Sequence, residues 1–571
     1  MKSRTFLTAI AFVSGLIFLA GIAGFWGLTS QNPRALLTKG GQAVPAAAQF
    51  VPRQAPIMVS LLARPDRLWQ LRQMLTSPSE RFQARQEWQS LQTALKDSMG
   101  WNYDTDVRPW LGQEIAIAVT AIDLDHDGTN GEQTGYLAVL GCQDGQKARE
   151  AIHLLWQKRA VSGKKLVFET VSGIPLIYDQ TPVNTTFKMP EQPSASPLAL
   201  ASLASAVVSN RYVLLANHPQ VLRQAIATFQ APDISLAKEA TYRASVASLP
   251  ANRIGWLYAN APSLFTWLGL EGRGEVMPLA NDGRRAHHLF MSFRATPSGL
   301  LGDTAIAAAS GTVFSADDAA QQPPTKALKL MPAATRFVLS GNNLPQLLSE
   351  AAEDVGGYEA VQQSLDVFWS SLDLPETASG ILGESVQGEY ALGMVAGKTS
   401  GWVLAAQTVA DKPLGTIDEL AQQEGLNVSH VRLGDSDITV WTRLSLWLTE
   451  PNGIANLETQ VVGVHTAINN YQVFSTSLPA LQQALRLEDN GSPLSEQPLF
   501  TQLIDQLDPS YNSLAYLDWP YLAPSLMRRF PWLRALEQAG KPLTDHLGPI
   551  FTVGYGGDSS LQRGLVAIDL S

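Results

Sequence analysis

The sequence has few charged residues and a single cysteine. Charged residues make up 16% of the 571 residues, against roughly 25% in typical globular proteins. One thiol, Cys142, excludes an intrachain disulfide and a zinc site built from several cysteines. The net charge of −10 argues against a nucleic-acid-binding protein, because a phosphate backbone requires a basic surface. The 44 glycines and 34 prolines are near average usage, which excludes collagen-like and low-complexity chains.

A long apolar stretch stands near the N-terminus. Phe6 to Leu28 contains no charged residue, and as a helix it is about 35 Å long. That length exceeds the hydrocarbon core of a bilayer, which is roughly 30 Å thick. We therefore expect a cytoplasmic stub and transmembrane anchor over residues 1–30, with the lipid bilayer as a partner, and a tether over 31–49. Basic residues flank the stretch on both sides, so the charge bias that sets orientation is weak.

A cleaved signal peptide is the alternative interpretation. An Ala-x-Ala site occurs at Ala46–Ala48, but it lies some twenty residues beyond the apolar stretch. Signal peptidase sites lie close to a shorter apolar core of about 7–15 residues. A lipoprotein anchor would need a cysteine where Ile22 stands. The sequence therefore favours an uncleaved single-pass anchor, with the bulk of the chain extracytoplasmic.

The remaining chain contains an internal repeat. Short matching stretches occur in the same order in both halves, at an offset between about 260 and 280 residues. The pairs are Phe50–Pro52 with Leu330–Pro332, Ile57–Leu61 with Phe337–Ser340, Trp110–Glu114 with Ile381–Ser385, Asn210–Leu214 with Asn470–Phe474, and Asn252–Leu257 with Asn512–Leu517. We expect the two halves to superpose strand for strand.

The repeat predicts two tandem homologous domains, over residues 50–310 and 326–571. The joint is a linker at 311–325, which is rich in Ala, Gln, Asp and Pro. Within each half, alternating strands are joined by short polar turns, which indicates hairpins and a mainly antiparallel sheet. Helices intervene without strict strand–helix alternation, and one is expected over Arg81–Ser98 with Phe82, Trp88, Leu91 and Leu95 on one stripe. The fold class is α+β.

Charge divides unevenly between the halves. Residues 51–310 contain 24 basic and 22 acidic residues, a net of +2, whereas 326–571 contain 13 and 27, a net of −14. A neutral half beside the lipid limits repulsion from anionic headgroups. Drift in surface composition explains the difference as well.

This layout of anchor, Pro-Ala tether and two diverged copies of a Leu-Gly-Glu/Gln–strand–hairpin unit resembles the largely cyanobacterial family called domain of unknown function 3352. The resemblance covers most of the chain beyond residue 50. It implies a photosynthetic bacterium, in which the anchor lies in the plasma or thylakoid membrane and the extracytoplasmic side is the periplasm or the thylakoid lumen. The family has no established activity, so the resemblance implies no catalytic residue and no cofactor.

A phosphate-loop-like stretch, Gly393–Thr399, does not indicate nucleotide binding. It has three residues between its glycines, whereas the phosphate-binding loop needs four. Strand-like residues flank it on both sides, and no helix start follows, as a phosphate site would require. The sequence therefore predicts a hairpin turn without nucleotide.

The corresponding turn of the first half is acidic. Asp123, Asp125 and Asp127 followed by Gly128 place oxygens at positions one, three and five of a calcium loop and a glycine at position six. Position twelve is Thr134, so Glu132 would have to complete the shell. A calcium-binding hairpin and a plain solvated turn both fit, and calcium is the one cofactor that the sequence suggests.

Other chemistry-bearing residues point to structure. His287 and His288 are neighbours on an expected strand and face opposite sides, so they cannot bind one metal together. Cys142 ends an apolar strand and is expected to be buried and inert. Arg528–Arg534 mixes cations with aromatic residues, as in an amphipathic helix with basic edges or a docking patch.

The sequence contains no nucleophile elbow and no His-Glu-x-x-His motif. We therefore expect a membrane-tethered binding or assembly module, with no catalytic residues assigned, no nucleic acid or nucleotide bound, and an unknown protein partner. An extracytoplasmic hydrolase with dispersed site residues and a carrier of an apolar ligand are the alternatives. A deep pocket lined with titratable groups would favour the hydrolase, and a deep apolar pocket the carrier.

If the acidic turn binds calcium, millimolar calcium should raise the melting temperature of the first domain, because a ligand that binds only the folded state stabilises it. Asp125→Ala should abolish the rise and leave the metal-free melting temperature nearly unchanged, since the second half builds its hairpin without the acidic residues. Thermal unfolding with and without calcium measures both. An unchanged wild-type melting temperature would identify a solvated turn.

Overall fold

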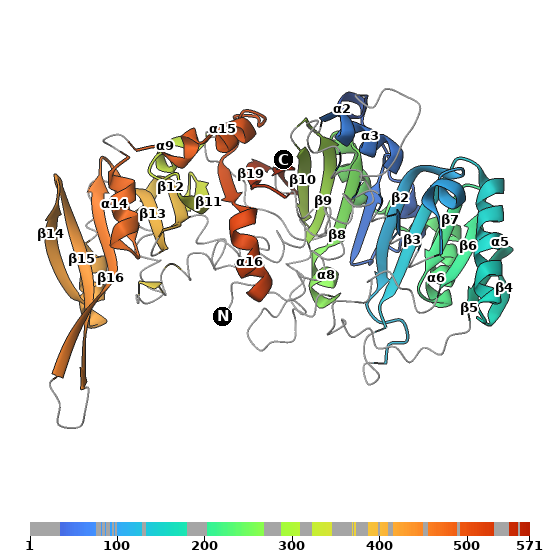
Figure 1. The fold of residues 1–571 in the computed structure, drawn as a ribbon, viewed down its shortest axis with the longest axis horizontal. Coiled ribbons are helices and arrows are strands. Elements are labelled where there is room, and N and C mark those ends of the chain that lie inside the picture. The colour runs from blue at the N-terminus through green and yellow to red at the C-terminus, as the bar shows by residue number, and fades with distance from the viewer. Residues whose placement is uncertain are drawn as a thin grey trace. The chain divides into compact units, whose positions relative to one another are not determined.

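The computed structural model describes two units, each taken by itself below (Figure 1). The first unit comprises residues 12–314, 525–547 and 568–571, and the second 1–11, 315–524 and 548–567. The described residues are 35–75, 82, 86, 89, 92–93, 96, 100–127, 133–179, 203–267, 287–297, 299–308, 323–344, 368, 371–372, 386–397, 400–408, 415–448, 455–487, 491–529, 547–557 and 560–570.

Strands of the first unit pair side by side in the order β4-β5-β6-β7-β3-β2-β1-β8-β9-β10, and every pairing is antiparallel. Their bounds are β1 (Ile57–Leu61), β2 (Leu111–Ala121), β3 (Gly135–Cys142), β4 (Leu166–Val171), β5 (Ile174–Asp179), β6 (Ala204–Val208), β7 (Tyr212–Ala216), β8 (Gly255–Asn260), β9 (His287–Ala295) and β10 (Gly299–Ala308).

Strands of the second unit pair in the order β14-β15-β16-β17-β13-β12-β11-β18-β19-β20. Their bounds are β11 (Thr335–Gly341), β12 (Val386–Val395), β13 (Gly401–Thr408), β14 (Asn427–Leu433), β15 (Ser436–Leu448), β16 (Ala455–Ile468), β17 (Tyr471–Ser475), β18 (Ser513–Leu517), β19 (Ile550–Gly557) and β20 (Leu561–Asp569). Element for element along the chain, this is the strand order of the first unit.

The described helices and helical turns lie between these strands. In chain order they are α2 (Ala35–Lys39), η1 (Ala47–Phe50), α3 (Pro65–Leu75), η2 (Tyr103–Val107), α5 (Gly145–Val161), α6 (Pro219–Gln230), η3 (Pro232–Ile234), η4 (Leu236–Lys238), α7 (Ala240–Ser248), α8 (Ala261–Trp267), α9 (Thr325–Leu328), α13 (Gly415–Gln423), α14 (Leu478–Leu485), η5 (Leu494–Glu496), α15 (Pro498–Ile504) and α16 (Trp519–Arg529).

Capping residues determine where two of the longer helices of the first unit, α5 and α6, begin. Asp144 caps α5, because its side chain accepts hydrogen bonds from the backbone N–H groups of Gln146 and Lys147. Pro219 opens α6 at a position where its missing N–H costs nothing, and His218 accepts from the N–H of Gln220. α5 packs on β6, and α6 packs on β3, β5, β6 and β7 (Figure 1).

The sheet of the first unit carries helices on both faces. Residues paired across antiparallel strands share a face, and successive residues alternate. Ser60 and Trp256 pair on one face, where Tyr242 of α7 packs against the Trp256 ring at 5.9 Å between centroids. Ser205 lies in the row of the opposite face, and Trp156 of α5 donates a hydrogen bond to its hydroxyl at 2.7 Å.

Residues 35–50, here called the leading segment, are folded onto the first unit. This differs from the expected tether over 31–49. Leu36, Ala47 and Phe50 are buried, and the N–H of Gly41 donates to the carbonyl of Arg253 at 2.7 Å. A Cβ on Gly41 would stand 2.0 Å from the carbonyl oxygen of Leu62, so only glycine allows this approach. Glycine serves close backbone packing here and not flexibility.

Several expectations are confirmed, and the expected apolar stripe over Arg81–Ser98 is not. The α+β class and the antiparallel hairpins are confirmed, including the β12–β13 turn at the phosphate-loop-like stretch. The described positions between 82 and 96 are helical, but Phe82 is 69% exposed, so it does not join a buried stripe. The expected anchor at 6–28 and most of the expected linker lie outside the described residues. Within the part of the chain that is described, no helix is long and apolar enough to cross a bilayer.

Gly41→Ala should release the leading segment. The added methyl meets backbone at 2.0 Å, and overpacking of this kind costs about 1–3 kcal/mol. Trypsin should then cut after the exposed Lys39 roughly tenfold faster, since cleavage follows the population of the open form. Gly141→Ala is the control, because its Cβ would lie 3.4 Å from the backbone carbonyl oxygen of Glu114, which is an ordinary van der Waals distance. Equal cleavage rates in wild type and Gly41→Ala would contradict the packed segment.

Candidate functional site

A buried carboxylate holds the leading segment to the sheet of the first unit. Glu114, on β2, is 2% exposed. Its two oxygens accept hydrogen bonds from the backbone N–H groups of Ala46 at 2.8 Å and Ala47 at 3.0 Å, and from the Gln42 side chain at 3.2 Å. These N–H groups begin η1, where a helical turn leaves donors unpaired and favours a negative charge. Glu114 therefore connects the start of η1 to a central strand.

Burial and hydrogen bonding act in opposite directions on this carboxyl group. Burial raises the pKa of Glu114 to about 7, although the hydrogen bonds from Ala47, Ala46 and Gln42 act to lower it. The Ser60 hydroxyl also acts to lower this pKa, but it approaches the carboxylate without reaching hydrogen-bond geometry. Glu114 thus changes charge near neutral pH, at the contact that joins the leading segment to β2.

The second unit repeats the contact. Glu389 on β12 accepts from the N–H groups of Lys326 at 2.8 Å and Ala327 at 3.0 Å, at the start of α9. The sheet registers place the two glutamates at the same position, because each immediately precedes the residue that pairs with the last residue of β1 or β11. The matching of Trp110–Glu114 with Ile381–Ser385 would instead align Glu114 with Ser385, which lies outside the described residues.

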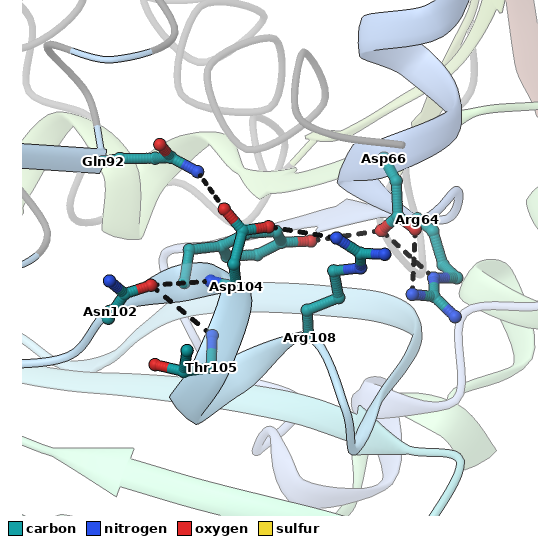
Figure 2. Close-up of polar contacts among 8 residues, drawn as sticks. Arg64, Asp66, Gln92, Asn102, Asp104, Thr105 and Arg108 are labelled. Carbon is teal, nitrogen blue, oxygen red and sulfur yellow. Dashed lines mark hydrogen bonds and ion pairs between the residues drawn. The ribbon is translucent and has the colours of Figure 1, made fainter. Parts of the chain in front are cut away.

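A second polar cluster, in the first unit, joins the start of α3 to a π-helical turn, η2 (Figure 2). The Asp66 carboxylate pairs with the Arg64 guanidinium at 2.9 Å and accepts from the Tyr103 hydroxyl at 3.2 Å. Burial raises the pKa of Asp66, and the Arg64 charge and the hydrogen bonds only partly oppose it. Arg64 also donates to Gln143 at 3.0 Å, next to the end of β3.

The outer side of this cluster caps the turn. The Asn102 side chain accepts from the N–H groups of Asp104 and Thr105, and Asp104 binds Arg108 at 3.2 Å and Gln92 at 2.8 Å (Figure 2). π-Helical turns are frequent at functional sites. Here the charged groups form ion pairs and hydrogen bonds with one another, and these contacts position α3 against η2.

The second unit carries a histidine–aspartate pair. Asp418 of α13 accepts, on one oxygen, from the Trp441 indole at 2.7 Å and pairs with His465 Nε2 at 3.0 Å. Burial acts to raise the pKa of Asp418, but the hydrogen bonds from His465 and Trp441 outweigh it and lower the pKa. This contact makes Nε2 the donor, so the neutral His465 ring presents Nδ1 as an acceptor.

The register places this histidine in a polar row. His430, Thr439 and His465 pair across β14, β15 and β16, and His430 Nδ1 lies 3.2 Å from the Thr439 hydroxyl. In the first unit the same row is Phe168, Ile177 and Ser205. No three His, Cys, Asp or Glu among the described residues are arranged to hold a metal ion.

The acidic turn remains a prediction. The Asp125 carboxylate accepts from the Asp127 N–H at 3.1 Å and the Gln133 side chain at 2.6 Å, and Asp123 accepts from the Gln133 N–H at 3.2 Å. These bonds shape the turn between β2 and β3. Glu132, the expected closing ligand, lies outside the described residues.

The other residues that the sequence analysis singled out are packed in strands or lie at a helix end. His288 of β9 stacks on Tyr258 of β8, and burial lowers the pKa of His288. Burial raises the pKa of Cys142 to about 12, so this half-buried thiol is unreactive in the folded unit. Arg528 and Arg529 end α16, and 530–534 lie outside the described residues. Sequence reasoning missed Glu114, Glu389, Asp66 and Asp418 as interacting groups. Their one signal is a charge within or beside an apolar stretch.

Comparison with known proteins identifies the family. A family model described as "Protein of unknown function (DUF3352)" matches residues 11–570, nearly the whole chain. The chain therefore belongs to this family, as the layout of the sequence predicted. No significant match is found among curated proteins or among solved structures.

The raised pKa of Glu114 makes the stability of the first unit depend on pH. The folded state binds this proton more tightly than the unfolded chain, so stability should be greatest below about pH 4.5 and fall as pH rises to about 7. The loss is on the order of 3 kcal/mol. Glu114→Gln should remove this slope, and Glu389→Gln should retain it.

Cys142 provides the measurement, because this single thiol reports unfolding of the first unit alone. Pulse labelling in urea between pH 4.5 and 8, normalised to the unfolded chain, gives the unfolding midpoint at each pH. A midpoint in Glu114→Gln with the same pH slope as in wild type would show that another group titrates.

Proposed function

We propose that this protein is a membrane-tethered binding or assembly module whose bulk lies outside the cytoplasm. One observation carries the proposal. Strands β15 and β16 of the second unit continue past their neighbours as a two-stranded ribbon (Figure 1). Two-stranded ribbons are marginally stable by themselves in water, so a projecting ribbon with apolar residues is best explained as a contact surface.

The ribbon exposes apolar side chains. Leu444 is 53% exposed and Val461 is 39% exposed. Leu444 pairs with Thr459 and Val461 with Thr442, so the two apolar residues are diagonal neighbours on one face. Arg443 on the neighbouring position is also exposed, so both faces of the ribbon meet solvent there. Exposed apolar residues with a polar rim are typical of protein-interaction surfaces.

The tether rests on the apolar stretch from Phe6 to Leu28. The packed leading segment begins at Ala35, seven residues after that stretch. Seven extended residues span at most about 25 Å. An uncleaved anchor would therefore hold the first unit close to the bilayer, which suits its nearly neutral charge.

We further propose that the two units are diverged copies of one domain. The common strand order, the equivalent glutamates and the matching bridges Pro52–Ser235 and Pro332–Pro493 support this origin. One copy can then lie beside the membrane while the other carries the contact ribbon.

Purification from the native membranes tests this function. Residues 1–48 should be present in the mature chain, which should resist an alkaline wash. Wild type should co-purify a protein that Leu444→Ser with Val461→Ser loses, because a polar side chain removes the apolar contact. Leu154→Ser is the control, since Leu154 is 54% exposed on α5 of the first unit.

Two results would contradict the proposal. An N-terminus near Gln49, or release by the alkaline wash, would reject the tether. Identical co-purifying proteins from wild type and the ribbon variant would reject the contact surface.

A further inference from the structure

Each sheet ends at an edge strand with an exposed apolar side chain. Among the described strands, β4 pairs with β5 alone and β14 pairs with β15 alone. Phe168 on β4 is 69% exposed, and Val431 on β14 is 48% exposed. An apolar edge offers unpaired N–H and C=O groups to another chain, and folded proteins usually block it with charges, proline or a bulge. These two edges are therefore candidates for pairing with other chains.

Neither edge has these protections. The pairing of β4 with β5 covers Leu166–Val171 without a bulge, and β4 contains no proline. The one charged residue of β4, Glu169, binds the Arg223 guanidinium of α6 at 2.7 and 3.0 Å, so it compensates a charge of its own unit. The pairing of β14 with β15 covers Asn427–Leu433, again without a bulge. Both strands thus offer a continuous edge.

The turn after β4 determines which of its backbone groups point outward. Two residues with positive φ, Ser172 and Gly173, join β4 to β5, so Val171 and Ile174 form a hydrogen-bonded pair. Hydrogen-bonded and non-hydrogen-bonded pairs alternate along an antiparallel ladder. Pro175, which has no N–H, accordingly occupies the next, non-hydrogen-bonded position. The outward N–H and C=O groups of β4 belong to alternate residues, which are Leu166, Phe168 and Thr170.

The turn after β14 has the same length. It consists of Gly434, with a φ of 63°, and Asp435, so Leu433 and Ser436 form the hydrogen-bonded pair. The outward groups of β14 belong to alternate residues, which are Val428, His430 and Arg432. In an antiparallel pairing of the two edges, outward residues must lie opposite outward residues. Phe168 therefore lies opposite His430 or Arg432 in the registers that pair the strands over their length.

Charge selects the partner and the register. The half of the chain with β4 has a net charge of +2, whereas the half with β14 has −14, so two β14 edges would bring like charges together. The exposed Lys164 and Lys165 precede β4, and the exposed Asp435 follows β14. An antiparallel pairing places the start of one strand beside the end of the other. With Phe168 opposite Arg432, Lys165 lies opposite Asp435, and the guanidinium can stack on the exposed ring.

We propose that the β4 edge of one copy of this chain binds the β14 edge of a second copy, as an antiparallel strand pair with Phe168 opposite Arg432. Each copy carries one edge of each kind, so the contact is head-to-tail and repeats to form rings or filaments. Self-association of this kind goes beyond the proposed function and does not use the ribbon of β15 and β16. Leu444→Ser with Val461→Ser should therefore associate as wild type does.

Proline variants of the full chain in detergent test the pairing. Phe168→Pro and Arg432→Pro each remove an N–H that points outward, so the hydrogen bonds to β5 and β15 remain. Analytical ultracentrifugation should show wild type forming species larger than a dimer as its concentration rises. Each variant alone should stay monomeric at ten times the concentration at which wild type associates. An equimolar mixture should form a one-to-one pair, because each variant retains the edge that the other lacks.

Three results would overturn the proposal. Wild type that stays monomeric at every concentration would show that the edges do not pair. A single variant that associates as wild type does would show pairing of like edges or a contact elsewhere. A mixture of the two variants that stays monomeric, although each unfolds with the wild-type melting temperature, would show that the two edges do not bind each other.

Disulfide formation tests the register without proline. In the proposed register Val167 and Leu433 form a non-hydrogen-bonded pair, whose Cβ atoms lie about 4.5 Å apart, within reach of a disulfide. Val167→Cys chains mixed with Leu433→Cys chains should cross-link to each other, and neither should cross-link alone. Wild type gives the background from Cys142, and Val431→Cys in place of Leu433→Cys reports the other register. Equal yields with both partners, or Val167→Cys cross-linked to itself, would contradict the proposed contact.

Discussion

The packing of the first unit depends on one carboxylate that is withdrawn from water. Glu114 accepts two backbone N–H groups at the start of η1, and by doing so it fixes a segment that leads from the apolar N-terminal stretch into the sheet. η1 in turn contacts α6 and η4. A charge in this place costs desolvation, and the donors that it satisfies offset that cost. The contact therefore orders a part of the chain that would otherwise be a linker.

The two units use one scaffold for different chemistry. Both have the same strand order and the same glutamate contact with a helical turn. Beyond that, the first unit buries Tyr242 and Ser245 of α7 and Arg253 after it, where the second unit has Phe500, Leu503 and Tyr511. The second unit instead places His430, Thr439 and His465 in a row that is Phe168, Ile177 and Ser205 in the first. The two units therefore share the strand order and the glutamate contact, and they differ in the polar residues at equivalent buried positions.

Much of this fold follows from sequence pattern, but the register does not. Alternating strands and polar turns predict the antiparallel α+β class. The match of Asn210–Leu214 with Asn470–Phe474 is displaced by one residue from the structural register. The turn before β7 has three residues between the paired Val208 and Tyr212, whereas the turn before β17 has two between the paired Ile468 and Tyr471. The sequence match of Asn252–Leu257 with Asn512–Leu517 is displaced by two residues from the alignment that the strand pairing gives, in which Trp256 corresponds to Leu514. Irregular pairing before Ile115 and before Tyr390 displaces the two glutamates relative to the nearby Leu-Gly motifs.

The candidate sites are harder to predict for a related reason. Glycine, alanine and proline in the leading segment are typical of a flexible linker, and the same small residues permit the close approach of Gly41 to Leu62. A glutamate in a strand suggests a solvent-facing position, whereas Glu114 is buried because a distant turn supplies its donors. Such partners are set by tertiary packing, and no local pattern contains them.

Hydrogen exchange at the Ala46 and Ala47 amides tests the central contact most directly. Both amides donate to Glu114 at 2.8–3.0 Å. If the leading segment belongs to the first unit, these amides should exchange as slowly as those of the neighbouring strand β2, and both should open only with the whole unit. Exchange of Ala46 and Ala47 at the rate of an unstructured peptide, with β2 still protected, would contradict the account.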